Sequence, residues 1–264
     1  MEKSRYLLFV LLAFFAAANL QATTTCSFIP AGTTLTLQND CTTDASLVVP
    51  QGVTMDLNGH TVTANDPPLG HFMGGVIING GTSASVTNGT VQAAGLSDVC
   101  DGGANELRGV LFDGAAGSIT NLKVLNINQG ASGCQEGNAI EVRNAPFDNT
   151  GTDVAVTITG NIVTNYQKNG ITANGSVAAI IMNNVVTGAG PVNYIAQNGI
   201  QIGFGATAVV KNNTVSGNDY TPTSFVACGI LYFTADGVRA SENKLSGNER
   251  NFCNFGKGEG NPTF

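Results

Sequence analysis

Five charged side chains in the middle third of the chain have a spacing that could support carbohydrate chemistry. They are Arg108, Asp113, Glu141, Arg143 and Lys168. If the segments around them are neighbouring strands, Asp113 and Glu141 lie one strand and two residues apart, about 8 Å between Cα atoms. Inverting glycosidases hold their two carboxyl groups about 6.5–9.5 Å apart. The spacing therefore permits hydrolysis by a carboxylate pair.

A structural role would give the same pattern. Arg143 is expected one strand above Asp113 at the same strand position, and Arg108 close by. Ion pairs on a protein surface contribute only about 0–1 kcal/mol each. The cluster is thus also compatible with a ladder of salt bridges that has no catalytic task.

The elements that position these residues repeat along the chain. Short apolar openings recur every 29 to 34 residues and read GVIIN, GVLFD, AIEVR, GITAN, GIQIG and GILYF; they begin at Gly75, Gly109, Ala139, Gly170, Gly199 and Gly229. Each is followed by a second run in which apolar residues alternate with others, which is typical of strands. Strands that recur at this period without helices stack as rungs of a solenoid. The sequence therefore predicts an all-β, right-handed parallel β-helix with capped ends.

The alternation also predicts which side chains face the core. The second and fourth residues of the openings should point inward: Val76 and Ile78, Val110 and Phe112, Ile140 and Val142, Ile171 and Ala173, Ile200 and Ile202, Ile230 and Tyr232. The third and fifth should point outward: Ile77 and Asn79, Leu111 and Asp113, Glu141 and Arg143, Thr172 and Asn174, Gln201 and Gly203, Leu231 and Phe233. The charged cluster is then expected on the outer face of the coil.

The string MDLNGHTVT and the repeated GIxI…VxNNTVSGN pattern resemble the parallel β-helix repeat family, the superfamily of pectate lyases, polygalacturonases and alginate epimerases. The resemblance covers roughly residues 53–250. It implies that a substrate lies along an outward strand face bordered by long loops. The paired Asp-Asp and the Arg-x-Lys of polygalacturonases are absent, which argues against that subfamily.

The resemblance implies a second type of reaction, in which a base removes the C5 proton of a uronic acid. Arg143 or Lys168 would be the base, and a base of this kind needs a lowered pKa near neutral pH. Asp101 and Glu136 offer oxygen ligands that suit Ca²⁺, and the two carboxylates of the first mechanism could join them. The ion would neutralise the uronate carboxylate. Elimination and epimerisation are the reactions implied.

The two ends of the chain differ from the repeats. Residues 1–22 have the charged start, short apolar run and small-residue ending of a secretory signal peptide, which predicts a secreted or periplasmic protein. The apolar run is shorter than the roughly 20 residues that span a membrane. Residues 23–264 are then one domain, with an N-terminal cap at 23–52, rungs at 53–250 and a C-terminal cap at 251–264. Capped rungs favour a monomer.

Cysteine and charge content limit the partners. The chain has six cysteines, and in an exported protein an even number is usually paired; we expect Cys26–Cys41, Cys100–Cys134 and Cys228–Cys253. The net charge is −7, from 18 acidic and 11 basic residues. An acidic chain of this kind is a poor ligand for nucleic acid.

The sequence thus favours an exported enzyme that acts on a polysaccharide by elimination, epimerisation or hydrolysis. Among polysaccharides it favours those that contain uronic acids. Two alternatives stay open. One is a non-catalytic β-helix that serves as a surface binding or structural module. The other is an isomerase or cyclase for a small molecule held in a loop-lined pocket. The fold alone does not choose among them, because one fold can carry many activities.

Overall fold

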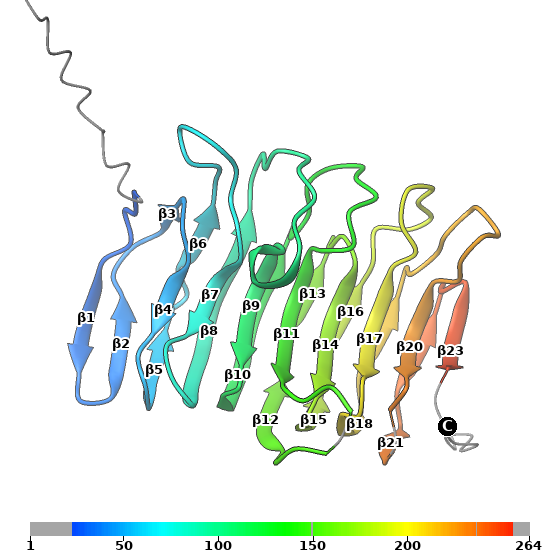
Figure 1. Ribbon diagram of the computed structural model, residues 1–264. Coiled ribbons are helices and arrows are strands. Elements are labelled where there is room, and N and C mark those ends of the chain that lie inside the picture. Colours follow the sequence, from blue (N-terminus) through cyan, green and yellow to red (C-terminus); the bar gives the residue numbers. More distant parts are fainter. Residues whose placement is uncertain (1–22, 149, 236, 256–264) are drawn as a thin grey trace, which may run out of the picture.

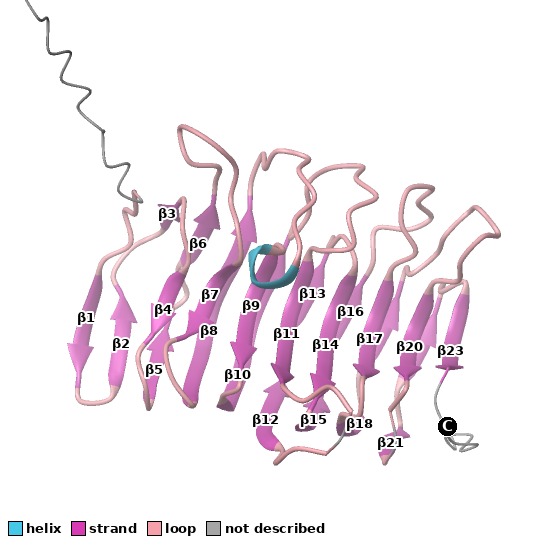
Figure 2. Cartoon of the chain, in the orientation of Figure 1, coloured by secondary structure: helices cyan, strands magenta, loops and turns pink. Residues whose placement is uncertain are grey.

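The strands wind into a stack of parallel coils (Figure 1). The computed structural model describes residues 23–148, 150–235 and 237–255. Within these ranges the chain consists of strands and loops apart from one short 3₁₀ turn, η1 (Gly103–Asn105) (Figure 2). The predicted all-β, parallel β-helix fold is confirmed. The predicted signal peptide and residues 256–264 of the predicted C-terminal cap lie outside the described residues.

Two sheets form the walls of the coil. The first has eight strands in the order β4 (Leu47–Val49), β7 (Gly75–Asn79), β9 (Arg108–Asp113), β11 (Asn138–Asn144), β14 (Asn169–Gly175), β17 (Asn198–Gly203), β20 (Cys228–Phe233) and β23 (Arg250–Phe255). All its neighbours are parallel. The six predicted openings form its strands from β7 to β20.

The second sheet contains the remaining strands, and it bends around the coil. Its main path is β1 (Phe28–Ala31), β2 (Thr34–Leu37), β5 (Val53–Asp56), β8 (Ser83–Ala93), β10 (Ala116–Leu125), β12 (Val154–Thr159), β15 (Val177–Met182), β18 (Thr207–Lys211) and β21 (Val238–Ser241). Beyond the bend lie β3 (Cys41–Thr43), β6 (Thr61–Ala64), β13 (Ile162–Thr164), β16 (Val185–Thr187), β19 (Thr214–Ser216) and β22 (Lys244–Ser246). Asn88 and Asn121, at φ 61° and 54°, mark the bend within β8 and β10. Asparagine tolerates this left-handed geometry better than most residues.

The core consists of stacked apolar columns, as predicted. Val110 pairs with Ile140, Ile140 with Ile171, and the column continues through Ile200 and Ile230. Each of these five side chains has no exposed surface. Burial of each contributes about 1.5–3 kcal/mol, so such columns hold the coils together.

The predicted register of the first opening is wrong by one residue. Ile77, which was expected to point outward, pairs with Val110 of the inward column, and Ile78 pairs with Leu111. Val76 is buried, as expected for a core residue. In GVIIN three apolar residues follow one another, so the sequence carries no alternation that could fix the register.

Residues 23–52 contain more than a cap. Strand β1 runs antiparallel to β2 and lies at the end of the stack. Strands β2, β3 and β4 pair in parallel with β5, β6 and β7. The antiparallel β1 therefore covers the edge of a coil that begins at β2.

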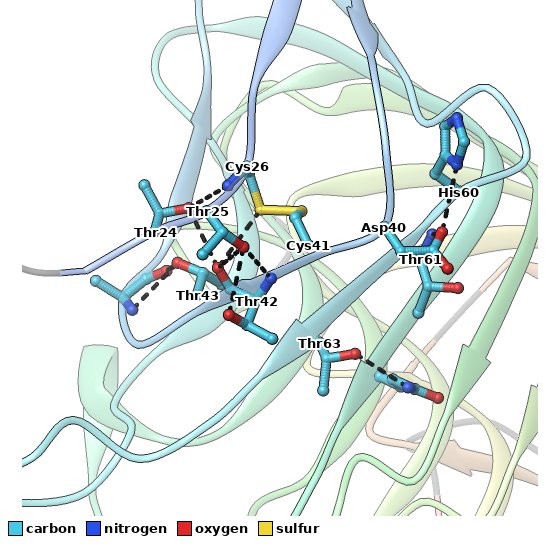
Figure 3. Close-up of a disulfide and its surroundings, with 12 residues drawn as sticks. Thr24, Thr25, Cys26, Asp40, Cys41, Thr42, Thr43, His60, Thr61 and Thr63 are labelled. Carbon is cyan, nitrogen blue, oxygen red and sulfur yellow. Dashed lines mark hydrogen bonds and ion pairs between the residues drawn. A yellow bond between two sulfur atoms is a disulfide. The ribbon is translucent and has the colours of Figure 1, made fainter.

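The three predicted disulfides are confirmed. Cys26–Cys41 ties the segment before β1 to the start of β3 (Figure 3), with Cα atoms 4.9 Å apart. Cys100–Cys134 joins the loops that precede β9 and β11, and Cys228–Cys253 joins β20 to β23. Each bond links consecutive coils or closes an end.

A buried ladder of asparagines lines the corner between the two arms of the second sheet. The side chains of Asn161, Asn184, Asn213 and Asn243 follow one another, with amide-to-carbonyl distances of 2.9–3.0 Å. Asn184 also accepts a bond from the backbone of Asn161 and donates one to the carbonyl of Ile158. The ladder thus provides hydrogen-bond partners for backbone groups at this corner, where no neighbouring strand pairs with them.

Replacing Asn184 with alanine is expected to lower the free energy of unfolding by about 3 kcal/mol, because a buried group left without its partner costs about 1–3 kcal/mol. Urea unfolding followed by circular dichroism measures the change. Asn193→Ala is the control, since Asn193 is exposed. Equal unfolding midpoints for both variants would contradict a structural role for the ladder.

Candidate functional site

The outer face of the eight-stranded sheet brings four of the five predicted catalytic residues together. Register places Arg143 beside Asp113 and Glu141 beside Leu111, with Arg108 beside Asn138. Lys168 comes from the loop that enters β14 one coil further along. Arg108, Glu141, Arg143 and Lys168 all line one cavity, whereas Asp113 lies outside its lining.

This first cavity has a volume of about 480 Å³. Its charged lining residues are Glu106, Arg108, Glu141, Arg143 and Lys168. Its amide lining residues are Gln135, Asn138, Asn169, Asn174 and Gln201, and two phenylalanines, Phe147 and Phe204, also line it. Such a surface offers many hydrogen-bond donors and acceptors and suits a hydroxylated, anionic ligand.

Arg108 and Glu141 form the buried floor of the cavity. Arg108 is 1% exposed, and its Nε donates to Glu141 Oε2. Its other nitrogens donate to Glu106 Oε2 at 2.7 Å and to the carbonyls of Gly103 and Glu106. Asn138 Nδ2 donates to the same Glu141 oxygen at 2.9 Å. Arg108 therefore anchors the η1 loop to the sheet, and Glu141 compensates its charge.

Arg143 lies nearer the surface. Its Nε and Nη2 donate to Asp113 Oδ2 at 3.0 and 2.8 Å, while its Nη1 is 3.9 Å from Glu141 Oε1. Asp113 is half exposed. Both carboxylates of the predicted hydrolytic pair are thus engaged by arginines, which favours an orienting role for them over the role of acid and base.

Lys168 stands apart from these ion pairs. Its Nζ donates to the carbonyl of Ala196 at 3.0 Å, and within the described ranges no carboxylate lies within ion-pair distance of it. Burial lowers the pKa of its amine to about 8, because a buried ammonium loses its hydration. A neutral amine is therefore accessible close to neutral pH.

The shifted pKa of Lys168 predicts a pH dependence of stability. Between about pH 8 and pH 10.5 the unfolded chain binds more protons than the folded one, so stability rises with pH in that window, by up to roughly 3 kcal/mol. Urea unfolding of the protein and of Lys168→Met at about pH 8 and pH 10 measures the difference. The rise should be smaller in the variant. An identical pH dependence in the two proteins would show that the amine titrates normally.

The two carboxylates predicted as calcium ligands have partners within the protein. Glu136 is 1% exposed, and its two oxygens accept backbone N–H groups, one from Asp101 at 2.8 Å and one from Leu107. The carboxylate of Asp101 is 2.8 Å from His71 Nε2. Among the described residues, no three His, Cys, Asp or Glu side chains are grouped so as to hold a metal ion. Asp101 and Glu136 instead fix the loops that precede β9 and β11.

An amide ladder that was not predicted from the sequence lies beside the charged cluster. Asn198 donates to Asn169 at 2.9 Å, and Asn169 donates to Asn138 at 3.0 Å. In all three coils the asparagine immediately precedes the small residue that begins the opening. This recurrence was the available signal. Because Asn138 also holds Glu141, the ladder connects the floor of the cavity to the next two coils.

A second cavity of about 770 Å³ adjoins the first, and Gln135 and Lys168 line both. Its remaining lining includes Tyr194, Tyr220, Phe225, Phe233 and Phe255. These aromatic residues come from loops and strands far apart in the sequence, and no repeat of the sequence indicated that they meet. Lys168 thus lies at the junction of a polar cavity and an aromatic one.

Comparison with known proteins supports the fold and leaves the activity open. Neither the curated proteins nor the solved structures gave a match. In the part of the chain that the structure describes, no helix is long and apolar enough to cross a membrane. Residues 147–260 match a family model described as a right-handed β-helix region. From the strands after β11 to the C-terminal coils, the chain therefore carries a right-handed β-helix, and the preceding coils continue the same stack.

Proposed function

We propose that the protein is an exported enzyme that cleaves a uronate-containing polysaccharide by elimination on the outer face of the eight-stranded sheet. The observation that carries this proposal is the position of Lys168. Its amine has a lowered pKa and lies in the wall of a cavity that also presents Arg143. The signal-like N-terminus and the three disulfides support export.

In the proposed reaction, neutral Lys168 takes the C5 proton of a bound uronate. The electron pair of the C5–H bond forms the C4–C5 double bond, and the C4–O glycosidic bond breaks. The departing oxygen takes a proton from water, and Lys168 later returns its own proton to water. A general base contributes about 10²–10⁴-fold when its pKa lies near the working pH.

Arg143 would bind the uronate carboxylate and stabilise the negative charge that develops next to C5. Two of its nitrogens are held by Asp113, which fixes the guanidinium plane. A donor that is oriented in advance stabilises developing charge without reorganisation at the moment of reaction. Asp113 is then a positioning residue, and Glu141 positions Arg108 and Asn138 in the floor.

A non-catalytic binding module is the second candidate. The ion pairs Arg108–Glu141 and Arg143–Asp113 favour it, since they would be equally useful in a rigid binding surface. In that case the protein would bind uronate polymers and release no product.

Turnover by the mature chain on acidic and neutral polysaccharides separates these candidates. Absorbance of unsaturated uronate and release of reducing ends are followed together, with calcium and with chelator. Elimination predicts both signals on uronate polymers, at the same rate with and without calcium. Reducing ends without absorbance would indicate hydrolysis instead. Binding of a polysaccharide without either signal would support the non-catalytic binding module.

A further inference from the structure

The outer face of the eight-stranded sheet changes its chemistry along the axis of the coil. One column of stacked residues shows this change: from β9 to β23 it reads Asp113, Arg143, Asn174, Gly203, Phe233 and Phe255. The column begins with an ion pair, continues with an amide and ends with two aromatic rings. A ligand that lies along this face therefore meets charge at one end and apolar surface at the other.

The apolar end is a cavity with aromatic walls. Phe225 is 69% exposed, Phe255 52% and Phe233 38%, and all three line it together with Tyr194 and Tyr220. Contiguous exposed apolar surface often marks an interaction site or a ligand-binding groove. Among the described residues that line this cavity, Lys168 is the one with a charged side chain. The cavity thus suits an uncharged aromatic group with a polar attachment.

The two cavities adjoin each other and share lining residues. Lys168 and Gln135 line both, and the rings of Phe204 from the first and Phe233 from the second lie 5.2 Å apart between centroids. Gly203 separates the amide part of the column from the aromatic part, and a Cβ there would lie 2.6 Å from Asn174 Oδ1. The glycine therefore leaves this position of the column without a side chain.

We infer that the ligand of this face is a uronic acid that carries an aromatic ring. The carboxylate lies in the first cavity against Arg143, and the ring lies in the second cavity between the phenylalanines and tyrosines. The arginine favours the carboxylate in the first cavity, and the aromatic side chains of the second cavity favour the ring. The position of the acid rests on the proposed function, whereas the position of the ring rests on the second cavity alone.

Titration calorimetry with three probes separates the two contributions. The probes are 4-nitrophenyl β-D-glucuronide, which has acid and ring, methyl β-D-glucuronide, which lacks the ring, and 4-nitrophenyl β-D-glucoside, which lacks the acid. The first should bind at least about tenfold more tightly than either of the others, because burial of a ring removes a large apolar area from water. Equal affinities for the two glucuronides would overturn the inference.

Two variants locate each contribution. Phe225→Ala should remove the advantage of the ring and leave the affinity for methyl glucuronide unchanged; Phe225 is exposed, so its loss should not disturb folding. Arg143→Gln should lower the affinity for both glucuronides and leave the affinity for the glucoside unchanged. Leu69→Ala is the control, since Leu69 is an exposed apolar residue outside the lining of both cavities. A ring advantage that survives Phe225→Ala, or that is lost in Leu69→Ala, would contradict the assignment.

Failure of this inference and failure of the proposed function give different results. If uronate polymers without aromatic groups give unsaturated uronate, and the two glucuronides bind equally tightly, the inference is refuted and the proposed elimination stands. If the nitrophenyl glucuronide binds more tightly but no polymer is cleaved, the inference stands and the proposed enzymatic function is refuted.

Discussion

Lys168→Met is expected to reduce the formation of unsaturated uronate by at least about 100-fold, because the variant has no base that can take the C5 proton. Methionine has a similar length and an apolar side chain, so it keeps the packing of the cavity wall. The thermal transition should therefore not fall. Initial rates of absorbance increase on a uronate polymer measure the effect.

Lys211→Met is the matched control for this substitution. Lys211 lies on β18 in the other sheet and pairs with Glu242 at 3.1 Å on the surface. Loss of that exposed pair should change stability by about 0–1 kcal/mol and leave turnover unchanged. Equal activity of both variants would remove Lys168 from the mechanism. Loss of activity in both would indicate a general effect of charge instead.

Glu141→Ala is expected to have the largest effect on stability, about 3 kcal/mol or more. Arg108 is buried, and the substitution leaves its Nε without the carboxylate that compensates its charge. Breaking one side of a buried ion pair typically costs about 3–5 kcal/mol. Glu106 is partly exposed and stays bound to Arg108, which moderates the loss. Urea unfolding at neutral pH measures the change.

Asp113→Ala is the comparison for this prediction. Asp113 is half exposed, so breaking its pair with Arg143 should cost only about 0–1 kcal/mol. The double substitution Arg108→Met with Glu141→Leu should recover stability relative to Glu141→Ala, since it removes both charges from the interior. If Glu141→Ala and Asp113→Ala lowered the free energy of unfolding by the same small amount, the floor of the first cavity would not depend on a buried ion pair.

The fold could be predicted because the sequence repeats its own pattern. Each opening places apolar residues two apart, and six openings at nearly constant spacing permit one arrangement in which those residues stack. The cysteine pairs followed from the same register, since Cys100 and Cys134 precede consecutive openings. The register of β7 could not be predicted, because Val76, Ile77 and Ile78 are all apolar.

The site could be predicted only in part. The stack placed Glu141 and Arg143 beside the strand of Asp113, as the repeat required. The role of Glu136 was hidden, because its partners are backbone N–H groups that no side-chain pattern reveals. The lowered pKa of Lys168 comes from burial of its amine in the folded chain, and the aromatic cavity is formed by segments far apart in the sequence. Loop conformation of this kind leaves no periodic signal.

The central claim is that Lys168 acts as a neutral base, and a pH–rate profile tests it most directly. The ratio kcat/KM for formation of unsaturated uronate reports the ionisation of essential groups in the free enzyme. It should rise with pH as a single proton is lost, with a midpoint near the pKa of about 8 that burial gives Lys168. A profile that is flat across that range, or that falls as pH rises through it, would contradict the account.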